Sequence, residues 1–378
     1  MNRGSFCAPS HGSRAFIWLA CLCLCTGLAA SNVRADTPLF ESHSVLELSL
    51  PIDFGTLCRP RETPDCDYTP TVLEYIDEHG KQQSLPVEIK IRGGWRSLVK
   101  NCSAPLLFIR FDEQYTIDTP FQGQSVLPLT THCGQGLSIE AARIRQYRST
   151  WEQNLLKEYL AHRLYNVITD VSLNARLVRM TYPNPDKPDR KIVNYAFFTE
   201  HFQSVASRTG AGLLPRGSFN HEKLDQSSAS RVALFQYMIG NTDWSIVRER
   251  NIVLLQETDA TQVPLPYDFD MSGLVDADYA GPAPTLPIDD VRERYYLGFC
   301  SPGANMDELF ELYLARKDEL LSMTGTISQL DKKSKKVAGR FLDDFFDILE
   351  SPGQRSEQIV NHCQPWPPGP TDHTSILD

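Results

Sequence analysis

The hydrophobic pattern changes character part-way along the chain. The first part contains segments in which apolar and polar residues alternate, which is typical of half-buried strands, and the later part is dominated by apolar residues at helical spacing. The expected strands are 45–50, 87–91, 106–111, 175–182 and 191–200, and the expected helices are 149–168, 227–239, 306–323 and 333–350. This order predicts an α+β protein, in which an antiparallel sheet and one long helix precede a mainly helical part.

The first 35 residues have the features of an export signal. Basic Arg3 and Arg14 precede the apolar stretch 15–30, which is shorter than the roughly 20 residues of a membrane-spanning helix. Small residues at Val33 and Ala35 then fit a signal-peptidase site. We therefore expect residues 1–35 to be a signal peptide and the protein to be exported, either periplasmic or secreted. No later segment is long and apolar enough to predict a transmembrane helix.

Cysteine usage agrees with export. Four of the ten cysteines lie in the expected signal, and an even number remains: Cys58, Cys66, Cys102, Cys133, Cys300 and Cys363. An even set in an exported chain predicts disulfides, although the sequence alone allows fifteen connectivities. Proximity in sequence favours the pairs 58–66, 102–133 and 300–363.

The charge balance bears on possible partners. The chain has 37 Lys and Arg against 47 Asp and Glu, a formal net charge of −10. Nucleic-acid binding needs a basic face that neutralises phosphates, and no basic stripe with interleaved aromatic residues is present, so we expect no nucleic-acid partner. The proline-rich end, 366–378, is expected to be disordered.

The densest run of chemically active side chains lies between residues 238 and 273. A helix is expected to end at a Gly-Asn turn before Asp243, Asn251 opens a strand, and a second strand ends at Asp268 and Asp270. Such a strand pair would bring these groups to one edge, as phosphoryl transfer requires: one carboxylate accepts the hydroxyl proton, and amide and carboxylate oxygens hold magnesium. The alternative is that Asn241 and Asp243 cap a turn and that the 268–270 pair binds calcium or faces water.

Five sequence phrases carry a resemblance to a known family. GNTDW, RERNIVLL and PYDFDMSG resemble the catalytic half of the CotH-type spore-coat kinases and, more distantly, HipA-like kinases. Upstream, VEIKIRGGW is similar to the Arg-Gly turn of the CotH N-lobe, and YAFFTEH to the strand that leads into the hinge. The resemblance covers about residues 85 to 275. It implies a bilobal protein-kinase-like fold, with an antiparallel N-lobe sheet and long helix over 36–200 and a mainly helical C-lobe over 201–365.

The resemblance also implies roles for the carboxylates and the amide. Asp243 would be the catalytic residue, and Asn251 and Asp268 would bind the metal ion. Asp270 would be a second carboxylate linked to the metal. The implied cofactor is Mg²⁺ or Mn²⁺ with ATP.

The nucleotide-binding residues that the resemblance implies are Arg92, Gly93, Gly94, Arg110, Glu158 and Glu200. Guanidinium and backbone N–H groups at the Arg-Gly turn suit anionic phosphates. Arg110 stands where the family places a phosphate-gripping lysine, with Lys90 and Lys100 as alternatives. Glu152 or Glu158 on the long helix would pair with that cation.

These observations favour an exported atypical kinase that transfers phosphate from a nucleotide to the hydroxyl of an unknown protein substrate. A second hypothesis is a catalytically inactive kinase-like module that binds or assembles in the cell envelope. A third is a hydrolase that uses Asp243 with a distant carboxylate such as Asp289 as an acid/base pair.

Overall fold

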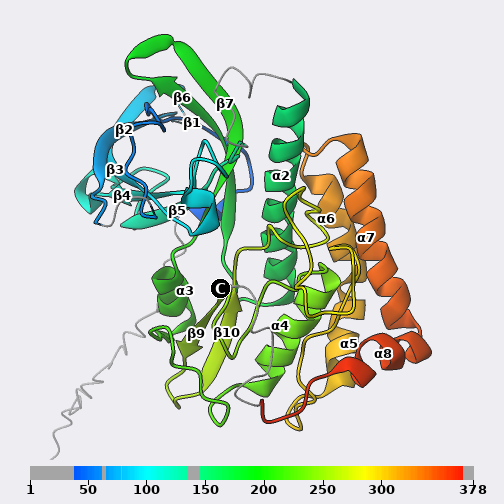
Figure 1. Cartoon of the computed structure of the whole chain (residues 1–378). Helices are drawn as coiled ribbons and strands as arrows, with labels where there is room; N and C mark the ends of the chain where they lie inside the picture. The colour runs from blue at the N-terminus through cyan, green and yellow to red at the C-terminus, as the bar shows by residue number, and fades with distance from the viewer. Residues whose placement is uncertain (1–37, 62–64, 78, 135–144, 369–378) are drawn as a thin grey trace, which may run out of the picture. The chain divides into compact units, whose positions relative to one another are not determined.

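Seven strands in the first part of the chain pair into one sheet (Figure 1). The computed structural model describes residues 38–61, 65–77, 79–134 and 145–368, so the expected signal peptide and the chain beyond residue 368 lie outside the described residues. The strands are β1 (Leu46–Ser49), β2 (Thr69–Ile76), β3 (Gln82–Ile91), β4 (Leu107–Phe111), β5 (Val126–Thr130), β6 (Ala175–Asn184) and β7 (Lys187–Thr199). Alternation along β3 and β4 turns one face of each strand toward a buried apolar interior.

The sheet closes on itself to form a barrel. The strand order is β1-β2-β3-β4-β5-β7-β6, and β1 returns to pair with β6. That last pairing is parallel, with Leu46 opposite Val178 and Ser49 opposite Thr181, whereas the other neighbours are antiparallel. Closure gives each of these seven strands a paired neighbour on both sides.

The prediction of a bilobal kinase-like fold with an open antiparallel N-lobe sheet is therefore wrong. The sheet is a closed, mixed seven-stranded barrel, because β1 pairs in parallel with a strand that follows it by more than a hundred residues. The described residues also group into one compact unit. The structure combines this barrel, in the first part of the chain, with helices that mostly follow it.

Helices make up most of the chain after the barrel. The helices are α1 (Pro38–Glu41), α2 (Arg145–Ile168), α3 (Phe202–Thr209), α4 (Gln226–Met238), α5 (Met306–Ala315), α6 (Lys317–Thr326), α7 (Lys332–Glu350) and α8 (Pro352–Gln358). Short 3-10 turns are η1 (Trp95–Ser97), η2 (Glu113–Tyr115) and η4 (Val360–His362). Asp225 and Asp331 begin α4 and α7 by accepting hydrogen bonds from backbone N–H groups of the first turn, as N-cap residues do.

Helix α2 connects the barrel to the helical part. It packs against β6 and β7 on one side and against α6 and α7 on the other (Figure 1). Leu156, Leu160 and Leu164 lie at helical spacing and are completely buried in the core of the helical part. The barrel interior forms a separate apolar cluster. Functional groups on α2 thus lie where the barrel meets the helices.

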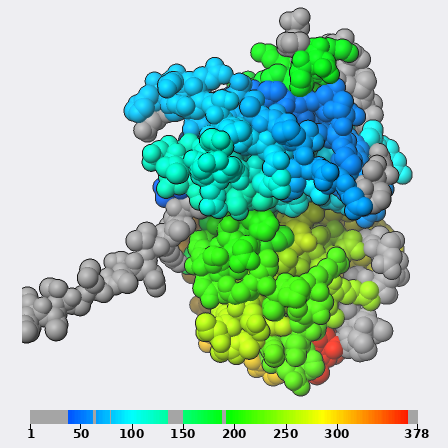
Figure 2. All heavy atoms as spheres, turned by 90° about the vertical axis from the view of Figure 1, so that its left-hand side faces the viewer, coloured from blue at the N-terminus to red at the C-terminus, as the bar shows by residue number. Residues whose placement is uncertain are grey.

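A second, small sheet contains the hairpin that leads to Asp268 and Asp270. It contains β8 (Gly212–Leu213), β9 (Ile252–Gln256) and β10 (Gln262–Pro266) in the order β10-β9-β8. In the view of Figure 2, the surface over β1 to β5 is blue to cyan and that over the β6–β7 hairpin is the green patch at the top. The surface over α3 and the small sheet, below the barrel, is green to yellow-green.

All six described cysteines are paired. The bonds are Cys58–Cys66, Cys102–Cys133 and Cys300–Cys363, which confirms the pairs favoured by proximity in sequence. Within the described ranges, no helix combines the length and apolar character needed to cross a membrane.

Candidate nucleotide-binding and phosphotransfer site

The β9–β10 hairpin brings Asn251 and Asp268 together. Its register pairs Ile252 with Pro266, and just beyond them the Tyr267 N–H donates to the Asn251 carbonyl at 3.0 Å. Both Asn251 and Asp268 have left-handed backbones, with φ of 50° and 61°. Asn and Asp tolerate this conformation better than most residues, and such local strain is concentrated at functional sites.

Asp243 is held beside this hairpin by the turn that ends α4. Gly240 takes a φ of 64°, and the Asn241 side chain accepts a hydrogen bond from the Asp243 N–H at 2.9 Å. The Asn251 amide donates to the Asp243 carbonyl at 2.7 Å and to its carboxylate at 3.0 Å, and Arg250 forms an ion pair with the same carboxylate. The structure thus brings Asp243, Asn251 and Asp268 to one edge, as the motif order predicted.

The environment of Asp243 makes its carboxylate more basic. Burial is the main cause of a raised pKa, and the negative charge of Asp268 adds to it. The positive charge of Arg250 and the Asn251 hydrogen bond oppose the rise. A carboxylate with a raised pKa is a better proton acceptor, which is the property needed to activate a hydroxyl nucleophile.

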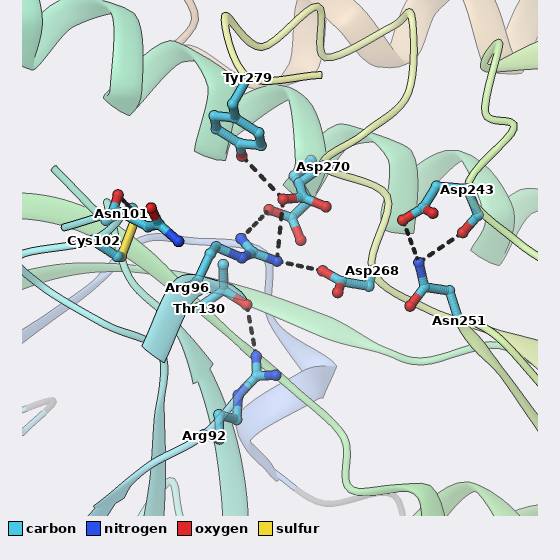
Figure 3. A network of polar contacts seen from close by, with 12 residues as sticks. Arg92, Arg96, Asn101, Cys102, Thr130, Asp243, Asn251, Asp268, Asp270 and Tyr279 are labelled. Atoms are coloured by element: carbon cyan, nitrogen blue, oxygen red, sulfur yellow. Dashed lines mark hydrogen bonds and ion pairs between the residues drawn. A yellow bond between two sulfur atoms is a disulfide. The ribbon is translucent and has the colours of Figure 1, made fainter. Parts of the chain in front are cut away.

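Arg96 lies at the centre of three acidic side chains (Figure 3). Its guanidinium is 3.4 Å from a Glu158 oxygen and 3.5 Å from an Asp270 oxygen, and it forms an ion pair with Asp268. The Tyr279 hydroxyl donates to Asp270 at 3.0 Å. Arg96 joins η1, α2 and the segment after β10 in one polar network.

The network is buried, and burial alters its titration. Burial raises the pKa of Glu158 to about 8 and that of Asp270 to about 6, while the Arg96 charge opposes both shifts. The charged form of a carboxyl group is disfavoured in a low-dielectric site, so Glu158 retains its proton most strongly. His162, one turn further along α2, is kept neutral because burial lowers its pKa to about 3.

A cavity of about 330 Å³ adjoins this network. Its volume falls in the range of about 300–1,000 Å³ of small-molecule sites. One wall is apolar and aromatic, with Phe202 and Tyr267 in ring contact at 4.9 Å, and Asp268 contributes charge. The lining residues are Pro60, Arg92, Gly93, Phe108, Pro128, Thr130, Glu158, His162, Leu173, Thr199, His201, Phe202, Tyr267 and Asp268.

Arg92 supplies a positive charge to the cavity. Its guanidinium donates to the Thr130 hydroxyl at 3.0 Å and lies 5.8 Å from the centre of the Phe108 ring. Among the described residues, no carboxylate forms an ion pair with it, and its buried Nε has no hydrogen-bond partner. Burial lowers the pKa of Arg92 to about 10, so it remains a cation at neutral pH. An unpaired guanidinium at a cavity wall is a natural anion receptor.

Three predicted nucleotide-binding residues do not line the cavity: Gly94, Arg110 and Glu200. Arg110 lies on the outer face of β4, where it donates to Glu88 at 2.7 Å and covers the Tyr68 ring at 4.1 Å. The Glu200 carboxylate accepts two hydrogen bonds from Arg208, at 3.1 and 2.9 Å, and therefore anchors the chain between β7 and α3.

The other predicted residues fall at or beside the cavity. Gly93 lines it with a φ of 93°, and Gly94 follows immediately, where an added Cβ would meet Arg61 at 3.1 Å. Of the two glutamates considered on α2, Glu158 lines the cavity.

Sequence reasoning did not single out Arg96, His162 or Tyr279. Two signals were available: Arg96 closes the Arg-Gly-Gly-Trp-Arg run, and His162 follows Glu158 by four residues on the same helix face. The partners of Arg96 come from α2 and from the loop after β10, which local patterns cannot connect.

The arrangement does not fit the implied Mg²⁺ or Mn²⁺. Asn251, Asp268 and Asp270 carry the oxygen donors that these ions prefer. However, the two aspartates already pair with Arg96, and within the described ranges no group of three or more His, Cys, Asp or Glu side chains is arranged to hold a metal ion.

Comparisons with known proteins found no matching family model, curated protein or solved structure. The resemblance to CotH-type kinases stays a prediction from the five sequence phrases.

The raised pKa of Glu158 predicts a pH dependence of stability. Between about pH 4.5 and 8 the folded protein keeps a proton that the unfolded chain releases, so this group's contribution falls as pH rises through that window. Glu158→Gln removes the titration. We expect urea unfolding to show that the variant gains stability relative to the unchanged protein from about pH 5 to about pH 8. His162 titrates in both proteins, so its contribution cancels when their free energies of unfolding are compared. A difference in unfolding free energy that stays the same from about pH 5 to about pH 8 would contradict the assignment.

Proposed function

We propose that this protein is a nucleotide-dependent phosphotransferase that acts on a protein hydroxyl. One observation carries the proposal: Arg92, which forms no ion pair among the described residues, shares a cavity with the apolar wall of Phe202 and Tyr267, next to a carboxylate edge that includes Asp243. An anion receptor beside a flat apolar surface suits a ligand with phosphates and a planar base.

In the proposed reaction, Arg92 binds the phosphates and the base lies against the wall formed by Leu173, Phe202 and Tyr267. Asp243 accepts the proton of the acceptor hydroxyl as its oxygen attacks the terminal phosphorus. The bond from that phosphorus to the bridging oxygen breaks, and the nucleoside diphosphate leaves with the bond's electron pair. Phosphoryl transfer depends mainly on positioning and charge stabilisation, which these groups supply.

The three disulfides support a location outside the reducing cytoplasm. We therefore propose an exported protein, periplasmic or secreted, whose acceptor is another exported protein.

The role of Arg92 predicts a loss of affinity. Arg92→Met keeps much of the side chain's length but removes its charge, so we expect calorimetry to show ATP binding weakened by about tenfold or more, the loss of one charge-assisted contact. Arg110→Met is the matched control, because that arginine is on the barrel exterior and pairs with Glu88. Equal affinities for the two variants would remove the main support for the proposal.

A second candidate is a nucleotide-binding module without turnover. Arg96 favours it, because the carboxylates expected to bind metal are already neutralised by a guanidinium. Tight nucleotide binding with no phosphate transferred to any acceptor would select this candidate.

A further inference from the structure

Arg96 lies where the sequence predicted a metal ion. Its guanidinium contacts Glu158, Asp268 and Asp270, which come from α2 and from the segment after β10. Both the Arg96 side chain and that of Glu158 are buried, with exposed fractions of 8% and 5%. A buried cation among carboxylates from separate elements offsets their negative charge, which is one task of a bound metal ion.

The charges explain why the position requires a cation. Buried carboxylates that lose their partner face a large desolvation penalty, which only protonation or another cation relieves. Tyr279 adds a hydrogen bond to Asp270 but no positive charge. Arg96 is the cation that offsets this penalty for the buried Asp270, and it also pairs with Asp268, whose side chain is 35% exposed.

The backbone that carries Arg96 is fixed in place. The Arg59 guanidinium donates to the carbonyls of Ser97 at 2.8 Å and Cys102 at 3.2 Å, and Cys102 is bonded to Cys133. A segment held by a buried arginine and a disulfide keeps its side chain preorganised.

Aromatic contacts also hold Tyr279, the hydrogen-bond partner of Asp270. The Tyr279 ring contacts the rings of Trp95, at 5.2 Å, and Trp151, at 5.4 Å. Trp95 precedes Arg96 in η1, and Tyr279 bonds Asp270, so the guanidinium and its acidic partner are linked by packing as well as by charge. These contacts favour a permanent partner over a side chain that leaves when a metal ion arrives.

We propose that Arg96 replaces the divalent cation, so that this site binds its nucleotide without metal. This inference rests on the proposed function. Two arginines divide the usual tasks of the metal: Arg96 neutralises Asp268 and Asp270, and Arg92 meets the phosphates. Arginine carries a permanent charge on a side chain that belongs to the protein, so the site needs no added ion.

The first test compares ATP affinity in excess EDTA and in MnCl₂, by calorimetry on the protein beginning at Asp36. The inference predicts dissociation constants that agree within about threefold. Binding that requires Mn²⁺, or tightens by about tenfold or more with it, would overturn the inference while leaving the proposed function in place. Absence of binding in both buffers would instead overturn the proposed function and this inference with it.

The second test follows Mn²⁺ alone by electron paramagnetic resonance, without nucleotide. The unchanged protein should bind none at this site, whereas Arg96→Met uncovers Asp268 and Asp270 and should bind one ion. Arg110→Met, which uncovers the surface residue Glu88, is the control and should bind none. If Arg96→Met does not fold, the unchanged protein is compared with Asp270→Asn. Mn²⁺ binding by the unchanged protein that is lost in Asp270→Asn would overturn the inference.

Discussion

Asp243→Asn is expected to slow phosphoryl transfer by about 10²–10⁴-fold, the usual contribution of a general base, with ATP affinity changed by less than about threefold. The amide keeps the size of the side chain and can still bond Asn251, but it cannot accept the hydroxyl proton. The measurement is transfer of labelled terminal phosphate from ATP to the protein itself or to a generic acceptor such as casein.

Asp259→Asn is the matched control for this experiment. Asp259 is an exposed carboxylate in the turn at the other end of the same hairpin, where it accepts a hydrogen bond from the Thr261 N–H. We expect Asp259→Asn to transfer phosphate at the same rate as the unchanged protein. If Asp243→Asn also retains full transfer, Asp243 is not the base.

Phe269→Ala should lower the free energy of unfolding by about 3–5 kcal/mol, the typical cost of truncating a buried aromatic side chain. Phe269 has no exposed surface, and its ring lies 4.8 Å from that of His162 and 5.4 Å from that of Phe235. It therefore anchors the loop that carries Asp268 and Asp270 to both α2 and α4.

Urea unfolding measures this loss. Val360→Ala is the comparison, because Val360 is 43% exposed, and surface substitutions usually change stability by less than about 0.5 kcal/mol. A loss of less than about 1 kcal/mol for Phe269→Ala would show that the loop is held by other contacts.

The carboxylate edge could be predicted from sequence because its geometry is local. The segments 252–256 and 262–266 are joined by a short turn, so their antiparallel register is nearly determined by chain order, and Asn251 and Asp268 necessarily flank the same end. The turn after α4, with its Gly-Asn pair, likewise places Asp243 by local chemistry. In both cases, residues close in sequence determine where the functional side chain lies.

The closed barrel could not be predicted in the same way. Closure depends on β1 pairing with β6, and no local pattern specifies a partner so distant in sequence. Strands β2 and β5 were also missed, because Pro70 and Pro128 interrupt them and proline usually indicates a strand edge or a loop.

The alternation of apolar residues along β4 predicts the direction in which Arg110 points. Leu107, Ile109 and Phe111 alternate along β4 and are buried, so Arg110 must point to the opposite, outer face. Phe108 points to the same face and, unlike Arg110, lines the cavity. There it lies beside Arg92, which supplies the positive charge. Family resemblance suggested a cation on this strand, whereas the structure places the cavity cation just after β3.

The central claim is that the cavity beside Arg92 binds a nucleotide, and photo-crosslinking tests it most directly. The protein is irradiated with an azido-adenine analogue of ATP, and the labelled peptides are identified by mass spectrometry. The account predicts label on the peptides that contain Leu173, Phe202 or Tyr267, and competition by unlabelled ATP. Label confined to peptides outside the cavity, or label that ATP does not displace, would contradict it.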